Sequence, residues 1–176
     1  MESLCPDTSW FFRYQLLPAV EKFGDLINLE LVIFGKARFS GNDGLKIRCQ
    51  HGTAECLMNA FLICADEELL AASTSLLDRV SAITNLLKHQ IDDVTLRNSI
   101  ASVSDFPEYH SLRECAVSEK GMSLHRSHGI LTQALNPRLD FVPWITIDGN
   151  YERRAFRQLI DVLCDEAAGT HLANHC

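Results

Sequence analysis

The chain has 176 residues, 47% of them hydrophobic, and a formal net charge of −7 at pH 7. This length can bury one hydrophobic core but is short for two full-sized domains, so we expect a single domain over residues 1–176. Binding to a phosphate backbone depends on clustered Lys and Arg, which an acidic composition does not favour. We therefore expect no nucleic-acid partner.

The longest apolar run, residues 57–65, has the length of a core helix and falls short of the roughly 20 residues that span a bilayer. We therefore expect no membrane partner either. Seven cysteines are many for this length, and disulfides form mainly in oxidising compartments. The start, Met1-Glu2-Ser3, has no basic and apolar leader, so either a leader has been removed or this form does not enter the secretory route.

The first predicted element is a helix over residues 9–23, followed by two strands. Its apolar residues recur at helical spacing: Trp10, Phe11, Tyr14, Leu17 and Val20. Pro18 should kink this helix and Gly24 should end it, while Cys5 lies at its N-terminal edge. Residues 26–34 and residues 45–48 are predicted to form strands, with turn residues at 39–44 between them.

The second half is predicted to be helical from about residue 53 to about residue 135, because apolar residues keep helical spacing there. Residues 141–147 form a β-rich run that ends at Asp148-Gly149, a hairpin turn dipeptide, and residues 152–166 form a last helix. This order is typical of an α/β thioredoxin-like domain with a helical insertion at about 53–135. Only four residues precede Cys5, so the usual first strand is expected to be lacking or truncated.

One cysteine-containing motif has enough fixed residues at fixed spacing to indicate a protein family. Residues 49–64 read CQHGTAECLMNAFLIC. This resembles, without a mismatch, the C-Q-H-G-x2-E-C-x2-N-x4-C signature of the gamma-interferon-inducible lysosomal thiol reductase family. The resemblance continues through Glu114-Cys115-Ala116, Gly121-Met122, Val142-Pro143-Trp144, Asp148-Gly149, Cys164 and Cys176. A small departure lies at Phe34-Gly35-Lys36-Ala37, where the family usually has Tyr-Gly-Asn-Ala.

The resemblance implies a thioredoxin-like protein of lysosomes or secretions that reduces disulfides in protein substrates at acid pH. Its catalytic pair is C-x-x-C at the start of the first helix, where this chain has Cys5 and Thr8. Cys5 therefore carries over as the nucleophile, and the second, resolving thiol does not. A cysteine at a helix N-terminus is favoured as the reactive thiolate, and Thr8 could donate its hydroxyl to the Cys5 sulfur.

A mixed disulfide formed on Cys5 would have no neighbouring thiol to release it. We expect no bound cofactor, and net reduction would require an external thiol reductant. Val142 and Pro143 match the cis-proline position that lies beside the active cysteine in thioredoxin-like proteins, and Trp144 is expected to border the substrate groove. This hypothesis requires an accessible Cys5, since a buried or disulfide-bonded Cys5 would contradict it.

The other six cysteines are interpreted as structural disulfide cysteines: Cys49, Cys56, Cys64, Cys115, Cys164 and Cys176. They allow 15 pairings. Cys56 and Cys64 on one helix would be roughly 12 Å apart, beyond the Cα separation of about 7 Å that a disulfide tolerates. Cys164 and Cys176 are one possible pair, although either could have another partner.

Two interpretations of the signature remain. His51 could assist proton transfer, but His51, Glu55 and Asn59 are better explained as a structural cluster at a turn and helix start. A zinc site of Cys49, His51, Cys56 and Cys64 has suitable ligand types but an unusual spacing, and His171 with His175 is a weaker candidate, so we expect no metal.

The alternative function is a non-catalytic, disulfide-stapled scaffold that binds peptides or proteins in the groove near Trp144. Thr8 and the missing first strand favour it. An exposed, reactive Cys5 would favour the thiol-disulfide oxidoreductase instead.

Overall fold

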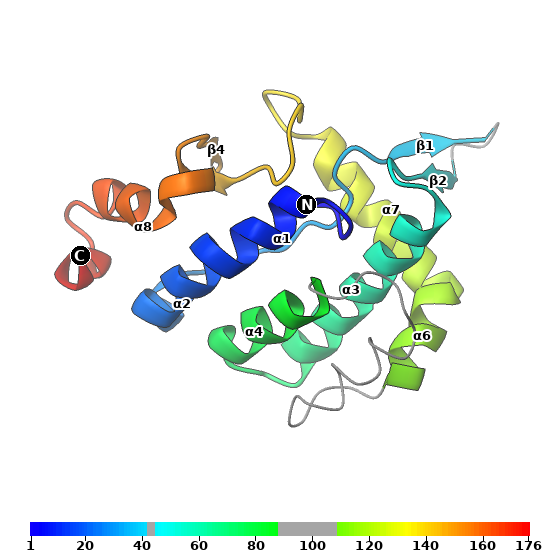
Figure 1. The fold of residues 1–176 in the computed structure, drawn as a ribbon, viewed down its shortest axis with the longest axis horizontal. Helices are drawn as coiled ribbons and strands as arrows, with labels where there is room; N and C mark the ends of the chain where they lie inside the picture. The colour runs from blue at the N-terminus through cyan, green and yellow to red at the C-terminus, as the bar shows by residue number, and fades with distance from the viewer. Residues whose placement is uncertain (42–44, 88–108) are drawn as a thin grey trace.

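Helices form most of the fold, and two short antiparallel sheets lie at its edges (Figure 1). The structure is a computed structural model and describes residues 1–41, 45–87 and 109–176. The described helical elements are α1 (Pro6–Phe11), the π-helical η1 (Phe12–Leu16), α2 (Leu17–Phe23), the 3-10 helix η2 (Gly24–Leu26), α3 (Thr53–Ala71), α4 (Leu76–Leu87), α6 (Tyr109–Val117), α7 (Glu119–Gln133), α8 (Ala155–Glu166) and the 3-10 helix η3 (His171–His175). The described strands are β1 (Arg38–Ser40), β2 (Lys46–Arg48), β3 (Thr146–Ile147) and β4 (Asn150–Tyr151). The chain is therefore mixed α/β.

The first predicted helix is confirmed, but it begins at Pro6 rather than at Ser9. Cys5 is its N-cap residue, and Pro6 occupies the first turn, where the missing N–H of proline costs nothing. The π-helical turn lies directly before α2, near the Pro18 position where the missing N–H disturbs the regular ladder. Gly24 ends the helix with a φ of 51°, as expected.

The strand predicted over residues 26–34 is wrong, because among the described residues this extended segment has almost no strand to pair with. Its hydrogen bonds to Met1 are the exception: the Met1 amine donates to the Val32 carbonyl at 2.7 Å, and the Phe34 N–H donates to the Met1 carbonyl at 3.0 Å. This is the bonding pattern of a parallel pair between Met1 and Ile33. A single residue pair is too short to count as a strand.

The helical prediction for residues 53–135 is confirmed for the described part of that range, and residues 88–108 lie outside the described residues. α3 packs against α4, α6 and α7, and it contributes fully buried side chains such as Leu62 and Ile63. Arg79 on α4 forms a buried ion pair with Asp66 on α3 and also donates to the Leu29 carbonyl at 3.0 Å. These contacts hold the extended segment 27–34 against the helices.

The strand predicted over residues 141–147 is mostly wrong. Only Thr146 and Ile147 are strand, and they pair with Tyr151 and Asn150 in a hairpin. The hairpin turn at Asp148-Gly149 is confirmed, and both residues have positive φ, 48° and 81°. The predicted second strand is β2, and its antiparallel partner β1 was not predicted.

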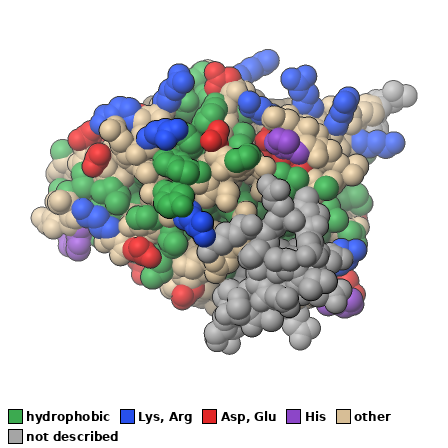
Figure 2. Space-filling view, in the orientation of Figure 1, with side chains coloured by type: hydrophobic (Ala, Val, Ile, Leu, Met, Phe, Trp, Pro, Cys, Tyr) green, Lys and Arg blue, Asp and Glu red, His purple; other side chains and the backbone are tan. Residues whose placement is uncertain are grey.

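The last helix, predicted over residues 152–166, is α8, which begins at Ala155 and has non-helical backbone angles at Gln158. The outer surface mixes charge and apolar side chains. Figure 2 shows Lys and Arg side chains along the upper edge of one face, although the chain as a whole is acidic. Among the described residues, no helix is both long and apolar enough to cross a membrane.

Candidate thiol site

Cys5 is the unpaired cysteine of the chain, whose seven cysteines all lie in the described residues. It precedes α1 with extended backbone angles, φ −74° and ψ 120°. Its Sγ lies 3.7 Å from the carbonyl oxygen of Val142, to which the thiol donates a hydrogen bond. The prediction of one free cysteine at a helix start is therefore confirmed.

The accessibility predicted for Cys5 is wrong in this structure. Only 9% of the residue is exposed, and its neighbours Leu4 and Val142 are themselves intermediate and buried. The Val142 carbonyl, which accepts the hydrogen bond from the thiol, lies over the sulfur. This burial could not be predicted from the sequence, because Val142 lies 137 positions away in the chain.

Thr8, the residue at the position of a second cysteine, is fully buried. Its hydroxyl has no hydrogen-bond partner among the described residues, so the expected hydrogen bond to the Cys5 sulfur is not formed. Thr8 lies in the first turn of α1, one turn after Cys5. The position is thus compatible with a second thiol but supplies no chemistry of its own.

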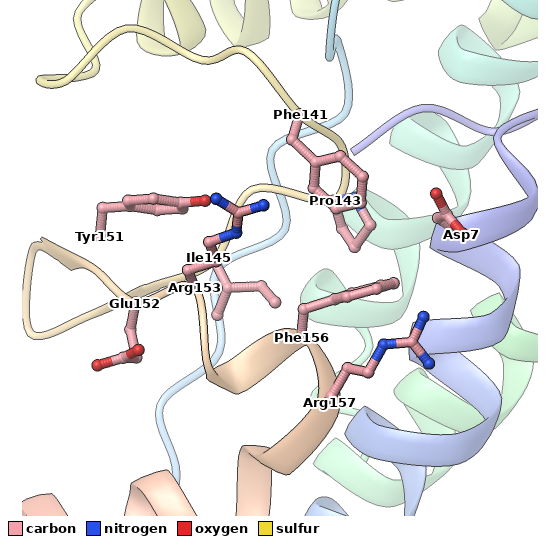
Figure 3. A pocket seen from close by; sticks show the side chains of 9 residues that line it. All are labelled: Asp7, Phe141, Pro143, Ile145, Tyr151, Glu152, Arg153, Phe156 and Arg157. Carbon is pink, nitrogen blue, oxygen red and sulfur yellow. The ribbon is translucent and has the colours of Figure 1, made fainter.

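The peptide bond between Val142 and Pro143 is cis, as the family resemblance implied. Pro143 lines a cavity of about 350 Å³ whose wall is formed by Asp7, Phe141, Pro143, Ile145, Tyr151, Glu152, Arg153, Phe156 and Arg157. Figure 3 shows Asp7 on α1 on one side of Pro143, with Phe156 and Arg157 of α8 below. The cavity therefore lies between α1, the cis-proline segment and α8.

The three residues predicted to bind substrate take different places. Pro143 lines the cavity, whereas Val142 is buried and contacts Cys5. Trp144 is not among the residues that line the cavity, but it stacks on Tyr151, which does line it, with ring centroids 3.6 Å apart. The sequence predicted the neighbourhood of the groove but not its individual contacts.

The six remaining cysteines form three disulfides, and this part of the prediction is confirmed. The pairs are Cys49–Cys56, Cys64–Cys115 and Cys164–Cys176. Cys56 and Cys64 do not pair with each other, as their spacing on α3 required. The zinc site of Cys49, His51, Cys56 and Cys64, which the sequence did not favour, is excluded, since sulfurs bound in disulfides are not thiolate ligands.

The structural interpretation of His51 and Glu55 is supported by the start of α3. The His51 N–H donates to Glu55 Oε1 at 3.0 Å, and His51 Nδ1 lies 2.5 Å from Glu55 Oε2. Asn59 was expected to bond locally. Instead its Oδ1 accepts from the Ser3 N–H at 2.9 Å, which ties α3 to the segment before Cys5.

Sequence analysis missed Glu2 and the aromatic wall of the cavity. Glu2 is fully buried, and its carboxyl accepts a short hydrogen bond from the Lys36 N–H. Burial raises the pKa of the Glu2 carboxyl, and the nearby Glu55 adds to the effect. Phe156 and Arg157 looked like ordinary residues of an amphipathic helix, so only the packing of α8 against α1 shows their place in the cavity wall.

The fold and the site together define a disulfide-stapled α/β protein with one free cysteine at a helix N-terminus, beside a cis proline. The family model described as gamma interferon inducible lysosomal thiol reductase (GILT) matches residues 1–101. The chain therefore belongs to the gamma interferon inducible lysosomal thiol reductase family.

Curated relatives agree with this assignment. A GILT-like protein of Caenorhabditis elegans is 35% identical over 170 residues, which cover 94% of this chain and 50% of the relative. The gamma-interferon-inducible lysosomal thiol reductase of Carassius auratus is 28% identical over 170 residues, or 93% of this chain and 64% of the relative. The enzyme of the same name from Mus musculus is 26% identical over 178 residues, or 99% of this chain and 68% of the relative. The chain thus spans between about half and two thirds of the length of these relatives.

Proposed function

We propose that this chain is a thiol-disulfide oxidoreductase that exchanges or reduces disulfide bonds in protein substrates through Cys5. The observation that carries the proposal is the position of the free Cys5, at the N-cap of α1 and in contact with the residue before cis Pro143. The names of the relatives as thiol reductases support it. A thioredoxin-like arrangement is part of the proposal, supported by the helix start, the cis proline and the parallel pairing of Met1 with Ile33.

In the proposed reaction, Cys5 loses its proton and its sulfur attacks one sulfur of a substrate disulfide. The substrate disulfide breaks, a Cys5–substrate disulfide forms, and the other substrate sulfur leaves as a thiolate that takes up a proton. Because Thr8 supplies no thiol, an external thiol reductant must then attack the mixed disulfide. Two external thiols are oxidised to a disulfide for each substrate disulfide reduced, and no bound cofactor is involved.

The burial of Cys5 contradicts the accessibility that the sequence hypothesis required, so the proposal depends on opening of the site. The hydrogen bond from the thiol to the Val142 carbonyl must break, and the cis-proline segment must move, before a substrate sulfur can reach Sγ in line. An extended substrate peptide placed along Pro143 would bond to backbone groups of the cis-proline segment, such as the Val142 carbonyl that Cys5 now contacts. A lysosomal or extracellular location, where disulfide-containing protein substrates occur, fits the three disulfides of the chain.

A second candidate function is a disulfide-stapled scaffold that binds peptides or proteins without thiol chemistry. The specific observations that favour it are the 9% exposure of Cys5 and the buried Thr8 in place of a second thiol. The cavity beside Pro143 would then hold a side chain of the bound peptide.

The test uses the native chain and an aromatic disulfide that releases a coloured thiolate on exchange. If Cys5 exchanges, the wild-type protein releases one equivalent of thiolate and gains the adduct mass on Cys5, whereas Cys5→Ser does neither. A wild-type protein that releases no more thiolate than Cys5→Ser when native, yet reacts fully when unfolded in guanidinium, would contradict the oxidoreductase. That result, together with retained binding of a peptide by both proteins, would support the scaffold.

A further inference from the structure

Three side chains that the proposed reaction does not use lie close together where the segment before Cys5 meets the start of α3. His51, Glu2 and Glu55 each offer one ligand atom, a ring nitrogen or a carboxylate oxygen, and these three atoms lie within 4.8 Å of one another. Glu2 comes from the segment before α1, and His51 and Glu55 come from the turn and first turn of α3. The cluster therefore joins two parts of the chain that are about fifty residues apart.

The hydrogen bonds of the cluster leave one buried oxygen unexplained. Glu2 Oε1 accepts from the Lys36 N–H, and Glu55 Oε1 accepts from the His51 N–H. Glu2 Oε2 is buried and has no hydrogen-bond partner in the part of the chain that the structure describes. A buried carboxyl oxygen without a partner is costly, so a group that is absent from the protein chain itself would stabilise this arrangement.

We propose that Glu2, His51 and Glu55 form a binding site for a divalent transition-metal ion, with Zn²⁺ as the ion that fits the ligand set. One imidazole nitrogen and two carboxylate oxygens are ligands that Zn²⁺ takes, and sites with three protein ligands keep a fourth position for water. Both carboxylates are fully buried, whereas His51 is exposed, so the ion would enter from the side of the imidazole ring. This site uses none of the cysteines considered as zinc ligands from the sequence, because their sulfurs are held in disulfides.

Binding is coupled to protons. Zn²⁺ binds ionised carboxylates and an unprotonated imidazole nitrogen, so it competes with protons for these three side chains. Two carboxylates then balance the charge of the ion. Affinity is therefore expected to rise with pH through the acid range.

The bound ion would also act on the fold near the thiol. Glu2 lies three residues before Cys5, and the Ser3 N–H is already bonded to Asn59 of α3. A metal that links Glu2 to Glu55 would fasten this segment to α3 at a second point. Folding stability should then increase with the concentration of the ion, because the ligand set exists only in the folded chain.

The test is a calorimetric titration of the full chain with Zn²⁺. The protein is first freed of metal with a chelator, with its disulfides intact. Titrations in two buffers of different ionisation enthalpy count the protons released. We expect one ion per chain with proton release, and a loss of affinity of at least about tenfold in Glu2→Gln and in His51→Asn. The matched control is His171→Asn with His175→Asn, which removes the histidine pair near the C-terminus, and Cys5→Ser removes the free thiol. Both controls are expected to bind as tightly as the wild type.

Two further measurements keep the test decisive. Because His51 is exposed, His51→Asn will fold even if Glu2→Gln does not, and thermal unfolding with and without Zn²⁺ should show a stabilisation that His51→Asn lacks. Co²⁺ in place of Zn²⁺ should give visible absorption without a thiolate charge-transfer band. No saturable binding, equal affinity in His51→Asn, or a thiolate band that disappears in Cys5→Ser would each overturn the site. None of these outcomes depends on whether Cys5 exchanges disulfides.

Discussion

The Cys5 thiol and the Val142 carbonyl are in hydrogen-bond contact at 3.7 Å, although 137 positions separate them in the chain. This contact has two opposite consequences. It places the free thiol directly beside the cis peptide of Pro143, where a substrate chain would lie. It also covers the sulfur, so the proposed reactivity depends on how readily the cis-proline segment moves.

Thr8→Cys tests whether the only missing part of the redox site is the second thiol. The new thiol at position 8 would attack the mixed disulfide on Cys5, release the substrate thiol and form an internal disulfide. An intramolecular thiol acts at an effective concentration of order 1 mM, so against about 10 μM external thiol the release should accelerate roughly a hundredfold. The measurement is the decay of the adduct by mass spectrometry.

The matched control for this experiment is Thr8→Ser, which keeps a hydroxyl and should leave the adduct as long-lived as in the wild type. Cys5→Ser combined with Thr8→Cys should form no adduct on position 5. An adduct that persists equally in Thr8→Cys and Thr8→Ser would show that position 8 does not reach the Cys5 sulfur.

Thr8→Val should stabilise the protein. The Thr8 hydroxyl is buried without a partner among the described residues, and such a group costs about 1–3 kcal/mol. Valine has the same shape without the hydroxyl, so we expect a gain of about 1 kcal/mol in the free energy of unfolding, measured with urea. The control is Thr84→Val, because the buried Thr84 hydroxyl donates to the Val80 carbonyl at 2.6 Å. That variant should lose stability, and an equal change in both variants would refute the argument.

Local sequence signals were sufficient for some of the fold. Gly24 marks where the first helix ends, and Asp148-Gly149 marks a hairpin turn because two successive residues with positive φ favour Asp and Gly. The cysteine count with the α3 spacing predicted six paired cysteines and one free. Each of these features depends on a few neighbouring residues or on simple geometry.

The features of the fold and site that could not be predicted from the sequence depend on contacts between residues far apart in the chain. Residues 26–34 have strand composition, but a strand needs a neighbour, and within the described chain the bonds go to Met1. The burial of Cys5 depends on Val142, and the burial of Glu2 depends on α3. Propensity and spacing carry no information about such long-range packing, so the sequence indicated a free thiol at a helix start but not its burial.

The three disulfides should differ in their contribution to stability. In the chain-entropy account, a disulfide stabilises more when it closes a longer loop, and the sequence separations are 51, 12 and 7 residues. Replacing both cysteines by alanine should therefore cost about 4 kcal/mol for Cys64–Cys115, about 3 for Cys164–Cys176 and about 2.5 for Cys49–Cys56. Denaturant unfolding without reductant measures the three losses. Cys5→Ala closes no loop and serves as the control, and a reversed order would contradict the entropic account.

Stability should fall as the pH falls below about 6.5, because α7 holds the buried His125 and the half-buried His128 in their neutral form. Burial, with a smaller effect of the neighbouring His128, lowers the pKa of His125 from 6.5 to about 4, and burial lowers the pKa of His128 as well. His125 packs edge-on against Phe34, and His128 Nδ1 accepts from the Ile33 N–H at 2.9 Å, a bond that protonation of Nδ1 breaks. The unfolded chain therefore binds more protons than the folded one across this pH range.

The sign and size follow from the His125 values. A lowered pKa means that its contribution to folding is complete above pH 6.5 and is lost as the pH falls toward 4, with about 2 kcal/mol lost between pH 7 and pH 5. His125→Gln should make the free energy of unfolding less dependent on pH over this range, whereas His110→Gln, at an exposed histidine, should leave the dependence unchanged. Urea unfolding at several pH values measures both. A wild-type protein that is equally stable at pH 5 and pH 7 would show that these histidines are not held neutral, whereas a loss that His125→Gln removes would make α7 the element most sensitive to acid.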